Sequence, residues 1–387
     1  MSEEWPCVPA GTVTRQRREA VRLEAGVDYR TMGVRWYGKG AYSRGTVTTE
    51  SIKAKSLYRA RSGDFVFNRI DTQNGAFDVI NDELDGFLVT NEFPLYEVDA
   101  QALDARFLLF YFQQAEVQRQ IGLRRAGSEG RARWKEPDFE AWTIPLPPLP
   151  VQERIVEVIG AVDHQIAALD SEVETGWLAH GATREWLLST APRVPLASVC
   201  GVEARLVDPR LDEYADLIHV GVEAITKETG DIVEAKTARA DALISGKFLF
   251  GRSDVIFSKI RPSLRKVAVP GFEGLCSADA YPLTPVDGIP PTMLRESLLE
   301  NRFVDQVISM SGRTKMPKVN RTQLFSLDVA MPDPEDRQRV DAALLALRDQ
   351  IAATRSDVER LRAVRAALLT SLFNRDMEIT DAERAVA

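Results

Sequence analysis

The sequence predicts an α+β protein with two similar heads, each followed by a long helix, and with the two helices paired as an antiparallel coiled coil. A proline-marked junction that leads into an amphipathic helix occurs twice, and the stretch before each junction carries short β-branched and aromatic runs broken by Gly, Asn, Asp and Pro. The 387 residues exceed one typical core. We expect a first head over 1–149, a central helix over 150–190, a second head over 191–332, a C-terminal helix over 333–375 and a tail over 376–387.

The two junctions repeat in detail. The first reads Ile144-Pro-Leu-Pro-Pro-Leu-Pro-Val-Gln-Glu-Arg-Ile155 and continues to Asp163-His-Gln-Ile-Ala-Ala168; the second reads Val329-Ala-Met-Pro-Asp-Pro-Glu-Asp-Arg-Gln-Arg-Val340 and continues to Arg348-Asp-Gln-Ile-Ala-Ala353. Pro147 and Pro332 are 185 positions apart. This period is far longer than a solenoid unit and indicates a duplicated domain together with its helix.

Apolar residues in both helices alternate at spacings of four and three, as the a and d positions of a coiled coil do. The seam residues are Ile155, Ile159, Val162, Ile166, Leu169 and Val173 in the first helix, and Val340, Leu344, Leu347, Ile351, Val358 and Leu361 in the second. Each helix either packs on its own head or pairs with the other helix, and the matching length and phase favour pairing. Gly176 and Gly181 are interpreted as breaks that weaken the first helix beyond Val173.

The heads repeat more faintly. Ser62–Ile70 resembles Arg252–Ile260, and we expect each head to hold a mixed or antiparallel sheet with one helical stretch, near 105–112 and 293–299.

Composition and motifs argue against several classes of protein. No window approaches 18 uninterrupted apolar residues, and the N-terminus lacks the pattern of a signal peptide, so we expect a cytoplasmic protein. The three Cys and three His residues have no metal-ligand spacing. Glycine-rich cofactor loops and an Asn- or Asp-Pro-Pro-aromatic motif are absent, and Glu234-Ala-Lys236 is a chance match to a nuclease triplet. We expect no catalytic residues, no metal and no cofactor in this chain.

Nucleic-acid binding is better supported. Although the net charge is −8, basic loops recur around Gly127 and Gly312, which are also 185 positions apart. The candidates for DNA contact are Asn68, Arg69, Gln73, Arg124, Arg125, Arg131, Arg133 and Lys135 in the first head, and Lys259, Arg261, Arg265, Lys266, Arg313, Lys315 and Lys318 in the second. The alternative for any single arginine is a solvated surface charge. Trp36, Tyr37 and Trp134 pack either on a base or in a core.

The two junctions, their helices and the paired head motifs together resemble the specificity subunits of type I restriction-modification systems, over nearly the whole chain. The resemblance implies two target recognition domains that each read one half of a split sequence in double-stranded DNA. It also implies a coiled coil that sets the half-site spacing and docks two methyltransferase subunits, which would bind S-adenosylmethionine, and it leaves open a restriction subunit. The second junction departs from the family pattern because it lacks the Pro-Pro-Leu-Pro run and the first Gln, so the two docking sites need not be equivalent.

Two other readings stay open. One is a coiled-coil scaffold that joins proteins without reading DNA, and the duplicated basic loops argue against it. The other is an enzyme with an unrecognised nuclease or methyltransferase centre, which the missing motifs disfavour.

Overall fold

The computed structural model describes residues 5–52, 54, 56–70, 72–124, 133–202, 205–312 and 317–377. The chain divides into two compact units: unit 1 combines Met1–Ala168 with Val358–Ala387, and unit 2 is Leu169–Asp357. Among the described residues, no helix is long and apolar enough to cross a membrane.

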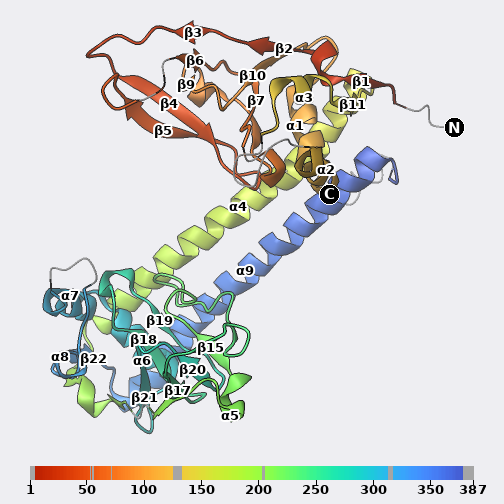
Figure 1. The fold of residues 1–387 in the computed structure, drawn as a ribbon. Coiled ribbons are helices and arrows are strands. Elements are labelled where there is room, and N and C mark those ends of the chain that lie inside the picture. Colours follow the sequence, from red (N-terminus) through yellow and green to blue (C-terminus); the bar gives the residue numbers. More distant parts are fainter. Residues whose placement is uncertain are drawn as a thin grey trace. The chain divides into compact units, whose positions relative to one another are not determined.

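Unit 1 contains three small sheets (Figure 1). A two-stranded sheet pairs β1 (Cys7–Pro9) with β11 (Thr143–Pro145). A four-stranded antiparallel sheet has the order β2 (Thr14–Arg17), β10 (Leu95–Val98), β7 (Phe65–Phe67), β8 (Phe77–Val79). A five-stranded mixed sheet has the order β3 (Ala20–Val21), β6 (Leu57–Arg59), β9 (Leu88–Val89), β4 (Tyr29–Val34), β5 (Ala41–Val47), with β4 and β9 parallel.

Unit 2 repeats these three sheets strand for strand. The two-stranded sheet pairs β12 (Arg193–Pro195) with β22 (Asp328–Ala330). The four-stranded order is β13 (Cys200–Gly201), β21 (Ala280–Pro285), β18 (Val255–Ser258), β19 (Val267–Ala268). The five-stranded order is β14 (Arg205–Val207), β17 (Lys247–Phe250), β20 (Gly274–Cys276), β15 (Ile218–Val220), β16 (Lys236–Thr237), with β15 and β20 parallel. The duplication read from the junctions therefore extends through both heads.

The heads hold more helix than the sequence predicted. Unit 1 has α1 (Ala105–Gln113), α2 (Ala115–Arg124), α3 (Glu136–Glu140) and the 3-10 turns η1 (Ala10–Thr12), η2 (Thr72–Asn74) and η3 (Asp82–Leu84). Unit 2 has α5 (Asp212–Ala215), α6 (Pro291–Leu299), α7 (Asn301–Met310), α8 (Arg321–Phe325), η4 (Leu196–Ser198) and η5 (Pro262–Leu264). The prediction of one helical stretch per head was wrong. A single residue in extended conformation separates α1 from α2 and α6 from α7, so each expected stretch is followed directly by a second short helix.

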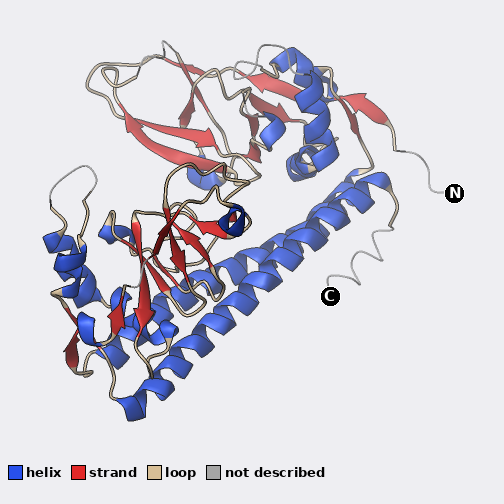
Figure 2. Cartoon of the chain, turned by 60° about the horizontal axis from the view of Figure 1, so that its bottom comes forward, coloured by secondary structure: helices blue, strands red, loops and turns tan. Residues whose placement is uncertain are grey.

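The two long helices are α4 (Leu149–Leu188) and α9 (Pro334–Asn374) (Figure 2). In unit 1, Arg365 of α9 forms an ion pair with Asp163 of α4. In unit 2, the Arg348 guanidinium lies 5.3 Å from the centre of the Trp177 ring. The early part of α4 thus meets the late part of α9, and the late part of α4 meets the early part of α9. The predicted fold class, including an antiparallel helix pair, is confirmed.

Each helix also packs on a head. Its apolar stripe therefore does both things that the sequence analysis treated as alternatives: it pairs with the other helix and it contacts a head. In unit 1, Ile155 and Ile159 of α4 and Leu368 and Leu372 of α9 belong to one cluster with the head's core. In unit 2, Leu188, Val340 and Leu344 join the second head's core in the same way. The twelve predicted seam residues are all buried or half-buried, while most of their helical neighbours are exposed.

The junction motif has a structural role. Gln152 is fully buried; its side-chain oxygen accepts from the Asp104 backbone N–H at 2.8 Å, and its nitrogen donates to the Ala102 and Pro147 carbonyls. In the second junction Arg337 occupies the equivalent place and donates to the Gly288 and Pro332 carbonyls. The altered junction therefore keeps the link between head and helix with a different side chain.

The expected glycine breaks are absent, because α4 is continuous through Gly176 and Gly181. A Cβ at Gly176 would lie 2.8 Å from Cγ1 of Ile351, so the missing side chain allows α9 to approach closely in unit 2. A Cβ at Gly181 would have 3.8 Å to its nearest neighbour, Arg184.

This difference predicts unequal effects on stability for two identical substitutions. Gly181→Ala should raise the free energy of unfolding by about 1 kcal/mol through helix propensity. Gly176→Ala gains the same propensity but overpacks the helix contact, at a cost of about 1–3 kcal/mol, and should lower stability relative to Gly181→Ala. Urea unfolding of both variants measures this; equal stabilisation by the two would contradict the close approach at Ile351.

Candidate nucleic-acid interface

In each head a basic or amide-rich segment follows the buried third strand of the four-stranded sheet. In unit 1 it is the segment 68–74 after β7, and in unit 2 it is the segment 259–265 after β18. All residues of both strands are buried, so each strand holds the start of its segment in a fixed position.

The structure joins each segment to the second basic loop of its head. In unit 1 the Trp134 backbone N–H donates to the Arg69 carbonyl at 2.9 Å. In unit 2 the Val319 N–H donates to the Lys259 carbonyl at 2.9 Å, and Ile260 forms an antiparallel bridge with Lys318. Two stretches that are far apart in sequence therefore meet at the same place on both copies of the scaffold, which the sequence did not predict.

Residues 68–70 of the unit 1 segment form a tight turn. Asn68 is buried and its side-chain oxygen accepts from the Ile70 N–H at 3.0 Å, so this amide shapes the turn. Gln73 lies in η2, and its side-chain oxygen is buried without a hydrogen-bond partner among the described residues. Beside it, the Tyr37 N–H donates to the Asn74 carbonyl at 2.6 Å, which fixes the β4–β5 connection against the turn. The Trp36 and Tyr37 rings are exposed at this connection, and exposed aromatic rings can stack on a base.

Trp134 has a different role. It is 1% exposed and packs against Phe67, Phe112 and Phe139 in the aromatic core of unit 1. Of the two readings for this residue, core packing is the one the structure supports.

Arg69 opens onto a cleft that the sequence analysis missed. The cleft has a volume of about 210 Å³, and its polar walls include Gln16, Arg17, Arg18, Arg69, Asn91 and Glu136. Arg69 forms an ion pair with Glu136, while its Nε is buried without a partner among the described residues. The sequence feature that could have indicated this cleft is the run Thr14-Arg-Gln-Arg-Arg18. It places Gln16 and two of these arginines at the end of β2.

The other predicted residues of unit 1 are spread out. Arg133 binds Glu92 through two hydrogen bonds of 3.1 Å, and Arg124 lies 4.6 Å above the Trp142 ring. Arg124 is at the end of helix α2 and Lys135 is the N-cap of α3, so part of the stretch expected to be a loop is helical. Arg125 and Arg131 lie outside the described residues.

In unit 2 most predicted cations hold the loops in place. Lys318 pairs with Asp279 at 3.1 Å, and Lys266 donates to the Val222 carbonyl at 2.7 Å. Lys259 donates to the Ala278 carbonyl, and Arg265 to the Leu299 carbonyl and the Asn301 side chain. Arg313 and Lys315 lie outside the described residues.

Arg261 stands apart from these. Its side chain is exposed and has no partner among the described residues, while its backbone N–H donates to the Pro317 carbonyl at 2.8 Å. Arg261 and Arg265 have φ values of 46° and 50°, so two non-glycine residues adopt the left-handed region on either side of η5. Such strain persists only where surrounding contacts impose it, and it is common at functional sites.

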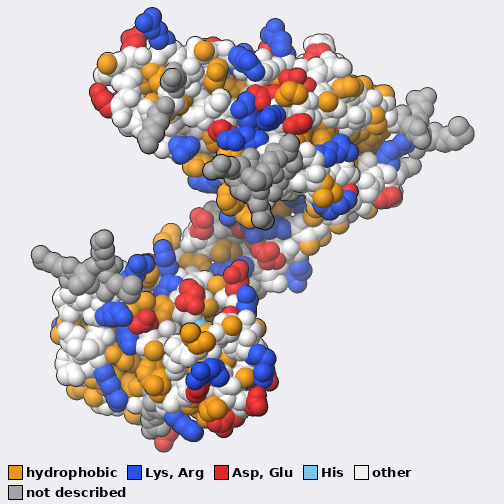
Figure 3. Space-filling model, in the orientation of Figure 1, with side chains coloured by type: hydrophobic (Ala, Val, Ile, Leu, Met, Phe, Trp, Pro, Cys, Tyr) orange, Lys and Arg blue, Asp and Glu red, His pale blue; other side chains and the backbone are white. Residues whose placement is uncertain are grey.

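The electrostatic surface is mixed. On the face drawn in Figure 3, Lys and Arg side chains are interspersed with Asp and Glu. Within the described residues, no group of three or more His, Cys, Asp and Glu side chains could hold a metal ion.

Comparison with known proteins identifies the first half of this arrangement. Residues 21–174 match the family described as the type I restriction modification DNA specificity domain. A curated relative, the type I restriction enzyme EcoDI specificity subunit of Escherichia coli, is 34% identical over 143 residues. The match covers 37% of this chain and 31% of that relative, so it spans about a third of the relative's length. The resemblance to type I specificity subunits is confirmed.

Solved structures extend the likeness to the whole fold. A chain from work on complex assembly and conformational transition of the type I R-M system has a TM-score of 0.58 at 17% identity, covering 96% of this chain and 98% of that one. The type I restriction-modification S subunit from M. genitalium has a TM-score of 0.52 at 13% identity, covering 96% of each chain. At these identities the likeness concerns the fold, and it includes the second head beyond the specificity domain.

Because of the Arg69–Glu136 ion pair, we expect the stability of the fold to depend on pH. Burial alone would raise the pKa of Glu136, but hydrogen bonds from Arg69 and neighbouring donors outweigh it and hold the pKa below its ordinary value. The carboxylate therefore stabilises the fold above about pH 4.3, the ordinary value for Glu, and this contribution is lost as the pH falls through the lower pKa of the folded state.

We expect Glu136→Gln to lower the free energy of unfolding at pH 7 by about 1–3 kcal/mol, and by less at acidic pH. Urea unfolding at a series of pH values measures the difference from the native chain. Glu83→Gln, at an exposed carboxylate, is the control. A difference that does not shrink toward low pH would contradict the role of the charged Glu136.

Proposed function

We propose that this chain is the non-catalytic DNA-specificity subunit of a type I restriction-modification complex, in which each head reads one half of a bipartite, gapped target in double-stranded DNA. The single observation that carries the proposal is the strand-for-strand duplication, with paired recognition loops at the same place on each head. The specificity domain over 21–174 supports DNA reading by the first head. Equivalent scaffolds with unlike loop residues, Asn68–Gln73 against Lys259–Arg265, are expected to read unlike half-sites.

The helix pair is the proposed spacer between half-sites. A helix of 40 residues is about 60 Å long at 1.5 Å per residue. At about 3.4 Å per base pair this corresponds to roughly 18 base pairs, and heads that lean inward would read a gapped site of about 12–16 base pairs.

Methylation mapping tests this function. Long-read sequencing of a host with the intact gene should show one two-part motif with an unspecified gap, and deletion of the gene should abolish it. A short contiguous motif, or no dependence on the gene, would contradict the proposal.

A point variant tests the division of labour. Arg261→Gln removes an exposed cation of the second head's loop, so methylation should weaken or relax in one half of the motif only. Arg210→Gln, an exposed arginine paired with Asp208, is the matched control. Relaxation of both half-sites by Arg261→Gln would contradict one head per half-site.

We further propose that the methyltransferase subunits of the complex dock on the helix pair, where S-adenosylmethionine would be bound by those partners. On α4 in unit 2, Leu178 and Trp186 are 76% and 73% exposed and lie on one helical stripe. Beside Trp186 is a groove of about 280 Å³ that includes Pro332 and Val340. Large exposed apolar side chains of this kind favour a protein contact.

The positions of α9 in unit 1 that correspond by the 185-residue period carry Ala363 and Ser371. The apolar pair therefore exists on one copy only, and the two docking sites should differ in affinity. A double variant, Leu178→Ser with Trp186→Ser, should lower the number of bound methyltransferase subunits from two to one in native mass spectrometry. Val364→Ser, at an exposed position of α9 in unit 1, is the control. Retention of both subunits by the double variant would contradict this docking site.

The alternative function is a coiled-coil scaffold that joins partner proteins without reading DNA. It also predicts docking on the helix pair, but it predicts no methylation motif that depends on this chain.

A further inference from the structure

The β4–β5 hairpin of the first head is basic, although the chain as a whole is acidic. Strand β5 is at the edge of the five-stranded sheet (Figure 1). Residues 29–47 carry four cations and no Asp or Glu, in a chain with a net charge of −8. The cations are Arg30, Arg35, Lys39 and Arg44; all four are exposed, and none forms an ion pair among the described residues. A basic segment without neutralising carboxylates suits a polyanion.

Two of these cations gather around one aromatic ring. The Arg35 guanidinium lies 4.3 Å from the centre of the Tyr42 ring. A Cβ at Gly33 would lie 3.0 Å from Cδ of Arg44 and 3.4 Å from Cε1 of Tyr42, so both side chains lie over this glycine. The hairpin therefore presents two arginines on either side of Tyr42 as one basic face.

The opposite face of the hairpin is fixed to the core of the head. Met32 and Val34 are buried, and Ala41 packs against the same apolar cluster. Because successive strand residues point to opposite faces, Gly33 and the side chains that cover it face away from this core. Arg44 is the extra residue where the pairing of β4 and β5 shifts. Such bulges redirect side chains and are common beside functional sites.

The tip of the hairpin is fixed beside the segment 68–74. Tyr37 has a φ of 58°, a left-handed conformation that is uncommon for a residue other than glycine. The N–H groups of Tyr37 and Gly38 donate to the carbonyls of Asn74 and Gly75, at 2.6 Å and 3.1 Å. Strain of this kind persists only where surrounding contacts impose it. The basic face thus continues directly into the segment that we propose reads DNA.

The corresponding segment of the second head has the opposite charge. Strands β15 and β16 occupy the places of β4 and β5, and residues 218–237 carry four carboxylates and two lysines. The Asp231 carboxylate accepts from Arg355 of α9 at 2.8 Å, and the Thr229 carbonyl accepts from Arg348 of α9 at 3.1 Å. This segment is therefore engaged with the helix in unit 2.

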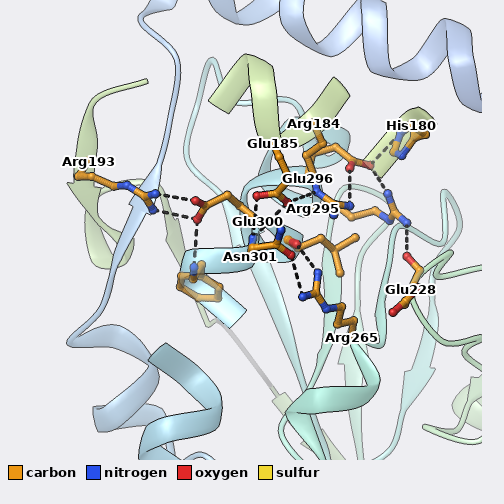
Figure 4. Close-up of polar contacts among 12 residues, drawn as sticks. His180, Arg184, Glu185, Arg193, Glu228, Arg265, Arg295, Glu296, Glu300 and Asn301 are labelled. Carbon is orange, nitrogen blue, oxygen red and sulfur yellow. Dashed lines mark hydrogen bonds and ion pairs between the residues drawn. The ribbon is translucent and has the colours of Figure 1, made fainter. Parts of the chain in front are cut away.

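Buried charges hold the same segment from inside the second head (Figure 4). Arg295 and Glu296 of α6 are each at most 3% exposed and hydrogen-bonded to each other. The Arg295 guanidinium also donates to the Glu228 and Thr229 carbonyls. The segment is thus fixed by contacts within the chain, and the unpaired basic hairpin is a feature of the first head alone.

We propose that the β4–β5 hairpin is a second DNA-contacting element of the first head, without a counterpart in the second. Arg35 and Arg44 bind phosphates of double-stranded DNA, as arginine forks do. The Trp36 and Tyr37 rings, 47% and 72% exposed, pack on sugar or base beside the segment 68–74. This rests on DNA reading by the first head, and it adds that the two heads make unequal contacts with the DNA.

The salt dependence of DNA binding tests the phosphate contacts. The probe is a labelled duplex of random sequence, and its fluorescence anisotropy is measured with the full chain over a series of KCl concentrations. Arg35→Gln with Arg44→Gln should make the plot of log Kd against log salt shallower by about 1.8, because each lost phosphate contact removes about 0.9. Arg35→Lys with Arg44→Lys keeps both charges and should keep the native slope.

The second head provides the matched control. Lys227→Gln with Lys236→Gln removes the same charge from two exposed residues of the corresponding segment, and the slope should stay native. Trp36→Ala should weaken binding about threefold or more, through lost packing, and should leave the slope unchanged. Thermal unfolding of each variant should match the native chain, because the replaced side chains are exposed.

Three results would overturn the proposal. The first is native binding to the duplex that does not depend on salt, and the second is a native slope in the double variant Arg35→Gln with Arg44→Gln. The third is loss of a methyltransferase subunit by that variant while its slope stays native, which would assign the hairpin to a protein contact. A bipartite methylation motif together with a native slope defeats the hairpin proposal alone. A shallower slope together with a contiguous motif supports the hairpin contact and defeats the bipartite function.

Discussion

The structure depends on the apolar seam between α4 and α9, because both ends of that seam are also part of a head's core. Ile155 and Leu372 lie in one cluster with the aromatic residues of the first head, and Leu188 and Leu344 do the same for the second. An isolated amphipathic helix of this kind is only marginally stable in water, so the helices and heads stabilise one another. The buried Gln152 and its counterpart Arg337 then fix where each head begins relative to its helix.

Much of this architecture follows from sequence pattern, for definite physical reasons. The four-three spacing of apolar residues predicted both helices and their pairing, since a buried stripe has the same period wherever it packs. Prolines marked the start of α4 and α9, where Pro148 precedes one and Pro334 opens the other. The glycines misled the prediction, because helix propensity disfavours glycine while close helix packing favours it, and at Gly176 the packing with Ile351 decides.

The interface was less accessible to sequence reasoning. Basic residues in a loop look alike in sequence, whether they pair with a carboxylate, as Arg133 does with Glu92, or stay exposed, as Arg261 does. Which of the two occurs depends on residues that are distant in the chain. The same limit applies to the joining of Arg69 to Trp134 and of Lys259 to Val319, which rests on backbone hydrogen bonds that no side-chain pattern encodes. The apolar periodicity of α4 likewise gave no sign of the charged cluster around Arg295 and Glu296.

The division between the two units falls inside α4, after Ala168, and inside α9, after Asp357. Both points are within continuous helix, where the backbone is hydrogen-bonded from turn to turn and offers no flexible linker for a protease or a truncation. A head cut away at residue 149 would lose Ile155, Ile159 and Leu368 from its core and expose the groove they fill. Each head should therefore be soluble and folded only when it keeps a segment from both ends of the helix pair, so that in this chain the unit that folds is discontinuous in sequence.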